Sequence, residues 1–188
     1  MNTANMPGHS ASSNPVGRAG RAGRGLSALY AAFARIPESA IQLLARVSLA
    51  VTFWASGQTK IEGLVLDPIG WSIELGWPRL SDSALDLFQT EYQLPLLSPS
   101  LAAPLAAVAE HVFPLLLLLG LATRLSAAAL LGMTAVIQIF VYPSAYATHG
   151  LWAALFLYLM ARGGGAMSLD RLLSPRGARS LSGRLGDA

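Results

Sequence analysis

The sequence has no cysteine and few charged side chains. Among its 188 residues, Asp, Glu, Lys and Arg together make up 12%. The absence of cysteine excludes disulfides, thiol redox catalysis and cysteine-ligated iron–sulfur or metal centres. A charge content this low, beside 53% hydrophobic residues, is untypical of a soluble domain and indicates an integral membrane protein.

The arginines lie in the two tails and beside apolar segments. Four precede residue 37, one is Arg124, and five lie between Arg162 and Arg184. Lys and Arg beside membrane helices orient a protein in the bilayer, because they remain on the cytoplasmic side. We therefore interpret the net charge of +3 as a topology signal. The predicted partner is a lipid bilayer, and no nucleic acid is expected.

Four apolar segments have the length of membrane helices or nearly so. They cover residues 39–57, 101–121, 125–142 and 147–161, of which the last, at about 22 Å, is marginal for a bilayer. With the N-terminus inside, ten arginines are cytoplasmic and only Lys60 and Arg79 lie outside. The prediction is an all-α, multi-pass integral membrane four-helix bundle. Its N- and C-termini are cytoplasmic, and a long outer loop joins helices 1 and 2.

Two tails and one loop surround this bundle. Residues 1–37 and 174–188 are basic and lack a pattern that could bury side chains, which predicts two disordered tails around a membrane domain at 38–173. In the outer loop, residues 83–92 predict a short amphipathic helix on the membrane surface. The loop also has the length of a segment that covers a site.

Glu110 is the residue that most needs a partner. It lies in the middle of segment 101–121, where a carboxylate is costly unless it faces another polar group or a water-filled cavity. Ala103, Ala106, Ala107 and Pro114 share its side of the helix and permit close packing. Arg46 lies on a polar arc of the first helix, about 12 Å from the cytoplasmic end, at a similar depth. This geometry predicts an Arg46–Glu110 ion pair.

Two interpretations of that pair remain open. It could be a purely structural clasp between helices. Alternatively, it could line a polar pocket for a hydrogen-bonding ligand such as a quinone headgroup, with Arg46 donating to a carbonyl oxygen and Glu110 relaying a proton. We name Arg46, Glu110, Gln42, Gln138 and Trp54 as the candidate pocket residues.

The histidines do not indicate a metal centre. His111 points about 100° away from Glu110 and is expected to form a hydrogen bond within the bundle. His149 is expected at the outer surface. Neither has carboxylate partners at metal-ligand spacing, so no metal is predicted. Gly163–Gly165 follows a helix and is interpreted as a terminator, not as a phosphate loop. No nucleophile–base triad is present, so no catalytic residue is assigned.

Several short motifs, taken in order, resemble those of the DoxX family of small bacterial membrane proteins, which includes relatives of the membrane subunit of thiosulfate:quinone oxidoreductase. The resemblance covers about residues 43–173. The matching pieces are Arg46 with Gly57 and Lys60, FQTEYQLPLL at 88–97, Glu110, GLATR at 120–124, FVYP at 140–143, and the turn before Ser168-Leu169-Asp170. Relatives often have Gly-Pro-Gly where this chain has Gly163–Gly165.

The resemblance implies a four-helix protein of the bacterial inner (plasma) membrane, often described as an oxidoreductase component. Without cysteine or cofactor ligands, the chain would need a quinone or a partner redox subunit to move electrons. We expect no covalently bound cofactor, and we expect segment 88–97 to cover the outer mouth of the site. The alternative is a non-catalytic membrane anchor or assembly module. Whether the chain is an enzyme, and whether it forms a homo-oligomer, the sequence leaves open.

Overall fold

The computed structural model describes residues 16–67, 70–95 and 97–174, with side chains from residue 25 onward. The chain divides into two units, Met1–Pro37 and Glu38–Ala188, which are described separately. The first unit contains helix α1, Val16–Phe33, in a region predicted to be disordered. Alanine, leucine and arginine have high helix propensity, which accounts for the helix despite its glycines. Residues 1–15 and 175–188, which include most of the predicted disorder, lie outside the described residues.

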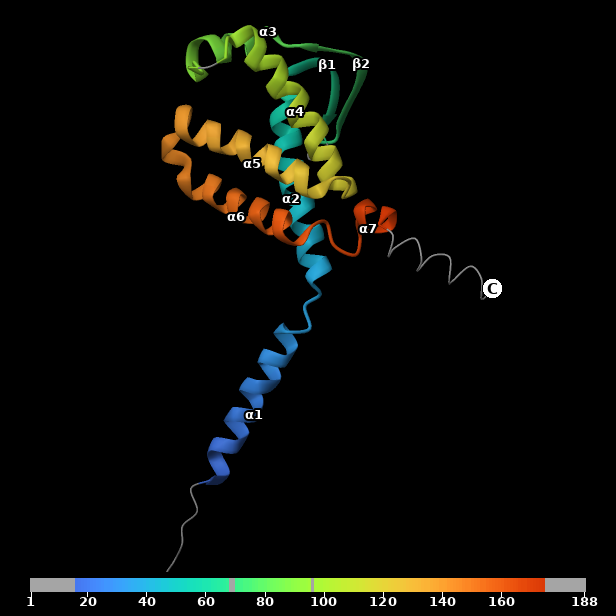
Figure 1. The fold of residues 1–188 in the computed structure, drawn as a ribbon, viewed down its shortest axis with the longest axis vertical. Coiled ribbons are helices and arrows are strands. Elements are labelled where there is room, and N and C mark those ends of the chain that lie inside the picture. The colour runs from blue at the N-terminus through green and yellow to red at the C-terminus, as the bar shows by residue number, and fades with distance from the viewer. Residues whose placement is uncertain (1–15, 68–69, 96, 175–188) are drawn as a thin grey trace, which may run out of the picture. The chain divides into compact units, whose positions relative to one another are not determined.

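The second unit is built around four helices. They are α2 (Glu38–Gln58), α4 (Pro99–Leu119), α5 (Thr123–Phe140) and α6 (Tyr146–Arg162). Helix α4 packs along α2, and α5 and α6 lie side by side as an antiparallel pair that crosses them (Figure 1). Each of the four predicted segments therefore corresponds to a helix, with ends within about two residues.

Helix α4 shows why the apolar pattern was informative. Its buried face carries small residues and the one acid, Glu110, whereas bulky aliphatics such as Leu105 and Val108 are exposed. The helix ends at Gly120, whose φ of 67° is readily adopted only by glycine. The following Leu121 N–H donates back to Leu116 O (2.8 Å), which closes the end of the helix.

The outer loop contains a β-hairpin that was not predicted. Strands β1 (Ile61–Asp67) and β2 (Ser72–Leu80) pair antiparallel, with Leu64 opposite Leu75 and Leu66 opposite Ile73. The all-α prediction is wrong in this respect. The strands satisfy the backbone polar groups of a loop that would otherwise have to bind water.

Short helical pieces complete the second unit. Helix α3 (Asp82–Leu87) continues into a π-helical turn, η1 (Phe88–Tyr92), in the region predicted to be amphipathic. The 3₁₀ turn η2 (Pro143–Ala145) joins α5 to α6. Helix α7 (Leu169–Leu173) begins at Ser168, whose hydroxyl accepts from Arg171 N–H at 3.4 Å.

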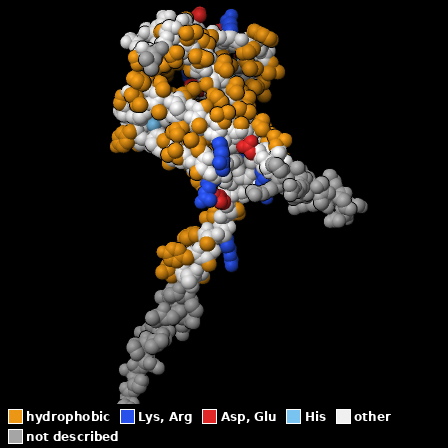
Figure 2. All heavy atoms as spheres, in the orientation of Figure 1, with side chains coloured by type: hydrophobic (Ala, Val, Ile, Leu, Met, Phe, Trp, Pro, Cys, Tyr) orange, Lys and Arg blue, Asp and Glu red, His pale blue; other side chains and the backbone are white. Residues whose placement is uncertain are grey.

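The core is apolar, and so is much of the outside. Leu49, Phe53, Leu130 and Phe156 form its centre, each at most 3% exposed. Figure 2 shows hydrophobic side chains over much of the visible face of the second unit, between charged groups at its two ends. Among the described residues, α2, α4 and α5 are long and apolar enough to cross a membrane. Helix α6, with 17 residues, is shorter.

Candidate functional site

Arg46 is held by backbone carbonyls. Its guanidinium donates from Nε to Leu117 O (2.7 Å), from Nη1 to Gly164 O (2.8 Å) and Met167 O (2.9 Å), and from Nη2 to Leu118 O (2.7 Å). The two leucine carbonyls belong to the C-terminus of α4, where unpaired carbonyls and the helix dipole favour a cation. Arg46 is 1% exposed and therefore ties α2 to the end of α4 and to the segment after α6.

Asp170 completes this end of the bundle. Its carboxylate accepts from the backbone N–H groups of Ala122 (2.7 Å) and Thr123 (2.9 Å) at the start of α5. Its own N–H donates to Gly120 O at 2.9 Å. A Cβ at Gly120 would lie 2.8 Å from the guanidinium carbon of Arg46, so the glycine leaves room for that side chain. We call the cluster of Arg46, Leu117, Leu118, Gly120, Gly164, Met167 and Asp170 the Arg46 hub.

Glu110 pairs with Lys60, so the predicted Arg46–Glu110 pair is wrong. Lys60 Nζ lies 2.6 Å from Glu110 Oε2, and the two side chains are only 5% and 4% exposed. The ammonium also donates to the backbone O and the Oγ of Ser56, both at 3.2 Å. All three of its hydrogens therefore have acceptors within the protein.

The packing of α2 against α4 explains the difference. A Cβ at Gly57 would lie 3.0 Å from Glu110 O, so this glycine brings the two helices close at the level of the carboxylate. Arg46 is eleven residues earlier on α2, about 16 Å along the helix axis, and meets the end of α4 instead. The similar depths of Arg46 and Glu110 in their predicted segments therefore did not predict which residues of α2 and α4 face each other.

His111 forms hydrogen bonds within the bundle, as predicted. Its Nδ1 lies 2.6 Å from Ala107 O, and its Nε2 lies 2.9 Å from Gln58 Nε2. A carbonyl and an amide NH₂ fix the roles, because the first can only accept and the second can only donate. In this arrangement Nδ1 donates to Ala107 O and Nε2 accepts from Gln58, so both ring nitrogens are occupied.

A cavity of about 520 Å³ opens beside the Lys60–Glu110 pair. We call it the Lys60–Glu110 cavity. Most of its wall is apolar and comes from α2, α4, α5, α6 and the stretch after α3. Its apolar lining includes Phe53, Phe88, Ala106, Ile137 and Trp152. Its volume lies within the range of small-molecule sites, which combine apolar walls with a few placed polar groups.

His149 provides a second polar group in this wall. It is 7% exposed, which corrects the prediction of a surface histidine. Its Nδ1 lies 2.7 Å from Gln138 Oε1, while Gln138 Nε2 donates to Pro143 O at 2.7 Å. The amide orientation assigns the Nδ1 proton to the histidine, so the Nε2 of a neutral His149 is an acceptor.

Two tyrosines lie at the cavity wall outside the membrane helices. Tyr142 donates to Glu91 Oε1 at 2.5 Å, and its ring contacts that of Tyr92 with centroids 5.9 Å apart. The hydrogen bond to Glu91, together with burial, raises the pKa of Tyr142 well above its usual value. Burial likewise raises the pKa of Tyr92. Both phenols are therefore protonated at neutral pH.

The five predicted pocket residues lie in three places. Glu110 lines the cavity, and Gln138 lies behind it as the partner of His149. Gln42 and Arg46 belong to the opposite end of α2, where Gln42 Nε2 lies 3.5 Å from Arg162 O. Trp54 faces the hairpin, where it donates to Leu66 O at 2.8 Å. From the predicted covering segment, Phe88, Tyr92, Leu94 and Leu97 line the cavity.

Lys60 and His149 are the cavity groups that the sequence analysis did not select. Lys60 follows Ser56 by four residues and so continues the polar arc of α2, a signal that was present in the sequence. It was assigned to the outer loop because it follows the apolar stretch. The burial of His149 depends on the packing of α6 against α5, which has no local sequence signal.

These observations define the protein as a helical, multi-pass membrane protein with a buried ion pair at the wall of an apolar cavity. Among the described residues, no group of three or more His, Asp or Glu side chains is placed to hold a metal ion. The model of the family described as DoxX matches residues 41–143, and the chain belongs to that family. Comparisons with curated proteins and with solved structures gave no match.

Proposed function

We propose that this DoxX-family protein binds a quinone headgroup in the Lys60–Glu110 cavity. It would act as the membrane subunit of a quinone-linked oxidoreductase system in the bacterial inner membrane. The observation that supports this proposal best is a buried ion pair that forms part of the wall of an apolar cavity. Ionisable groups inside a membrane domain are costly, so a pair that borders a cavity favours a functional role over a purely structural one.

The cavity fits the two halves of such a ligand. A quinone combines a flat ring with two carbonyl oxygens and an apolar tail. The aromatic and aliphatic wall suits the ring and the start of the tail, while Lys60 can donate to a carbonyl oxygen. Both bonds from its Nζ to Ser56 are long, at 3.2 Å, and one of them can be exchanged for a ligand without moving Glu110.

Each polar side chain would have a separate task. Bound quinone supplies a two-electron, two-proton acceptor, and its electrons would come from a redox centre in a partner subunit. Lys60 orients a carbonyl oxygen, and Glu110, 2.6 Å from Lys60, exchanges a proton with the same end of the ligand. His149 Nε2 lies at the wall where Gln138 holds the ring, and it would accept a hydrogen bond from the O–H of the reduced quinol.

The membrane arrangement is part of the proposal. Four crossings with both termini cytoplasmic would place the Arg46 hub near the cytoplasmic surface and Lys60 toward the outer one. The 17 residues of α6 span only about 25 Å, which is short for a bilayer. For α6 to cross, the bilayer would thin locally or a neighbouring helix would tilt. The segment after α3, which contributes Phe88, Tyr92 and Leu94 to the cavity wall, would then cover the outer mouth.

Purification in mild detergent tests the proposal. We expect quinone to co-purify, and we expect a short-chain quinone such as decylubiquinone to raise the thermal unfolding midpoint. Glu110→Gln should reduce both effects while the bundle still folds. If quinone neither co-purifies nor stabilises the native protein, the quinone site is wrong. If Glu110→Gln merely unfolds the bundle, the pair is a structural clasp.

The exposed face of the hairpin favours a second candidate, an anchor or assembly module. Ile73, Leu75 and Trp77 alternate along β2 and are at least 74% exposed. An apolar face of this kind fits a protein partner at the membrane surface. In that case quinone would leave the unfolding midpoint unchanged, and Leu75→Ser with Trp77→Ser would weaken a complex that Glu110→Gln leaves intact.

A further inference from the structure

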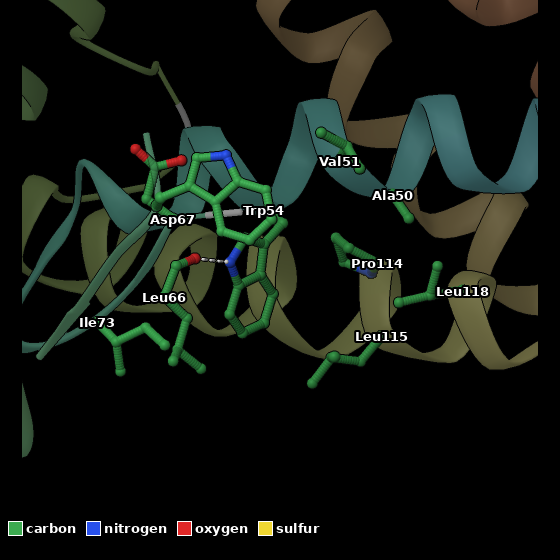
Figure 3. A pocket seen from close by; sticks show the side chains of 10 residues that line it. Ala50, Val51, Trp54, Leu66, Asp67, Ile73, Pro114, Leu115 and Leu118 are labelled. Carbon is green, nitrogen blue, oxygen red and sulfur yellow. Dashed lines mark hydrogen bonds between the residues drawn. The ribbon is translucent and has the colours of Figure 1, made fainter. Parts of the chain in front are cut away.

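A second hollow, of about 360 Å³, lies between the hairpin and the helices α2 and α4. We call it the hairpin groove. Its wall includes Trp54 and Val51 of α2, Leu66 and Ile73 of the hairpin, and Leu115 and Leu118 of α4. Figure 3 shows the Trp54 indole between Leu66 and the two leucines of α4. None of the residues that the structure describes lines both this groove and the Lys60–Glu110 cavity.

Side-chain hydrogen bonds hold the hairpin over this groove. Trp54 Nε1 donates to Leu66 O at 2.8 Å, and Leu66 N–H donates to Gln58 Oε1 at 2.7 Å. Gln58 is in turn bonded to His111 at 2.9 Å. Both backbone polar groups of Leu66 are thus tied to α2, and through His111 to α4. These contacts keep the roof of the groove in place.

The interior of the groove offers almost nothing to water. The indole N–H of Trp54 already bonds Leu66 O, and among the described residues of the lining Asp67 is the only charged one. The Asp67 carboxylate accepts from Gly70 N–H at 2.9 Å. A buried water needs two to four polar partners, and a space that lacks them stays dry and can take up apolar molecules. The chemistry of the wall therefore selects hydrocarbon.

The groove is continuous with the surface that faces the bilayer. Leu115 and Leu118 are each 45% exposed, and they extend an outward row of α4 that includes Val108 and Val112. Because α4 is one of the helices long and apolar enough to cross a membrane, we expect this row to face lipid chains. A chain can pass from the row into the groove without leaving apolar surroundings. Trp71, which is 91% exposed at the rim, suits the interface.

We propose that the hairpin groove is a lipid site that holds one acyl chain of a membrane phospholipid. The bound chain would pack between Trp54, Leu66 and Leu115 and would support the hairpin against α2 and α4. The chain enters from hydrocarbon and gains nothing by leaving water, so its retention rests on van der Waals contact with the groove walls. This proposal does not depend on the quinone site.

The test uses the full chain with Trp54 as its only tryptophan, made by Trp71→Phe, Trp77→Phe and Trp152→Phe. The protein is reconstituted in phosphatidylcholine with brominated acyl chains, which quench tryptophan on contact, and bulk lipid is then exchanged for detergent. We expect Trp54 to remain quenched after the exchange. Val51→Phe, which fills the groove, should abolish the retained quenching, whereas Val108→Phe on the outward row should not.

Native mass spectrometry of the unaltered sequence provides an independent measurement. The protein should retain phospholipid in detergent, and Val51→Phe should lose it. Full recovery of Trp54 emission on lipid removal would overturn the proposal. So would retention of quinone in place of phospholipid, or a dimer that shields Trp54 without quenching.

Discussion

Two buried cations, Arg46 on α2 and Lys60 just after the end of that helix, have different surroundings. Arg46 donates to four carbonyl oxygens at 2.7–2.9 Å and lies among helix ends. Lys60 has one carboxylate at 2.6 Å and two longer contacts to Ser56, and it borders a cavity. Burial alone therefore does not identify a ligand site. The useful distinction is whether the donors of the cation are fully and tightly matched by the fold.

This contrast also gives the family motifs separate meanings. The Arg46 hub unites the stretch 120–124 with the turn before Asp170, and its hydrogen bonds join helix ends. By contrast, Lys60, Glu110 and part of 88–97 meet at the cavity. One set holds the bundle together. The other set surrounds a space of ligand size, and the quinone proposal rests on that set.

The largest effect is expected from Arg46→Met. This change leaves four carbonyl oxygens without the Arg46 donor, although Leu117 O keeps a second donor, the Gly120 N–H. Each group left unsatisfied costs about 1–3 kcal/mol, so we expect a loss of about 3 kcal/mol or more. Thermal unfolding of the purified protein measures it. Arg124→Met is the matched control, because Arg124 is exposed and its hydrogen bond to Ala161 O is long, at 3.2 Å. Equal unfolding midpoints for the two variants would show that the Arg46 hub does not stabilise the fold.

The second-largest effect is expected when the Lys60–Glu110 ion pair is first broken and then replaced by two apolar side chains. Glu110→Leu leaves the Lys60 ammonium buried without its carboxylate, which should cost about 3–5 kcal/mol. Adding Lys60→Met should restore most of that stability, because an apolar pair tolerates burial. Quinone binding should remain lost in the double variant. A double variant that regains both stability and quinone binding would show that the charges are not part of the site.

A smaller effect is expected at His149. His149→Leu removes the Nε2 acceptor but keeps an apolar side chain beside Trp152, so the fold should persist. Loss of one ligand hydrogen bond corresponds to about 1.4 kcal/mol, or roughly tenfold weaker binding of the reduced quinol, because oxidised quinone has no O–H to donate to Nε2. Titration followed by thermal shift measures this change. Binding as tight as in the native protein would place the ligand away from α6.

The smallest effect is a pH dependence at Tyr142. Its pKa is raised in the folded protein by the hydrogen bond to Glu91, so the phenol stabilises the fold fully below its ordinary pKa near 10. That contribution declines as the pH rises above this value. The native midpoint should therefore fall more steeply at alkaline pH than that of Tyr142→Phe. Parallel curves for the two proteins would contradict the assignment.

The sequence predicted the helices well and their contacts poorly. Apolar length located α2 at 39–57 and α6 at 147–161, close to their observed ends, because burial in a bilayer demands such runs. The register between α2 and α4 is set by Gly57, whose missing side chain cannot be read as a contact without the partner helix. For the same reason, the sequence analysis assigned Lys60 to the outer loop and His149 to the outer surface, because the contacts that bury them come from other helices.

The hairpin was missed for a different reason. Alternating apolar residues at Ile73, Leu75 and Trp77 are typical of a strand, but the stretch was interpreted only as part of the long outer loop. The isolated segment has no partner strand for its backbone groups. Strand β1 provides that partner, and the Glu62–Arg79 ion pair at 3.0 Å joins the two strands.

The most direct test is the thermal shift caused by decylubiquinone in three proteins: native, Arg46→Lys, and the double variant Lys60→Met with Glu110→Leu. We predict that quinone raises the midpoint of the native protein and of Arg46→Lys by similar amounts, although the latter starts lower. The double variant should start near the native midpoint and show no shift. A quinone shift that disappears with Arg46→Lys and persists in the double variant would contradict the assignment of the ligand to the Lys60–Glu110 cavity.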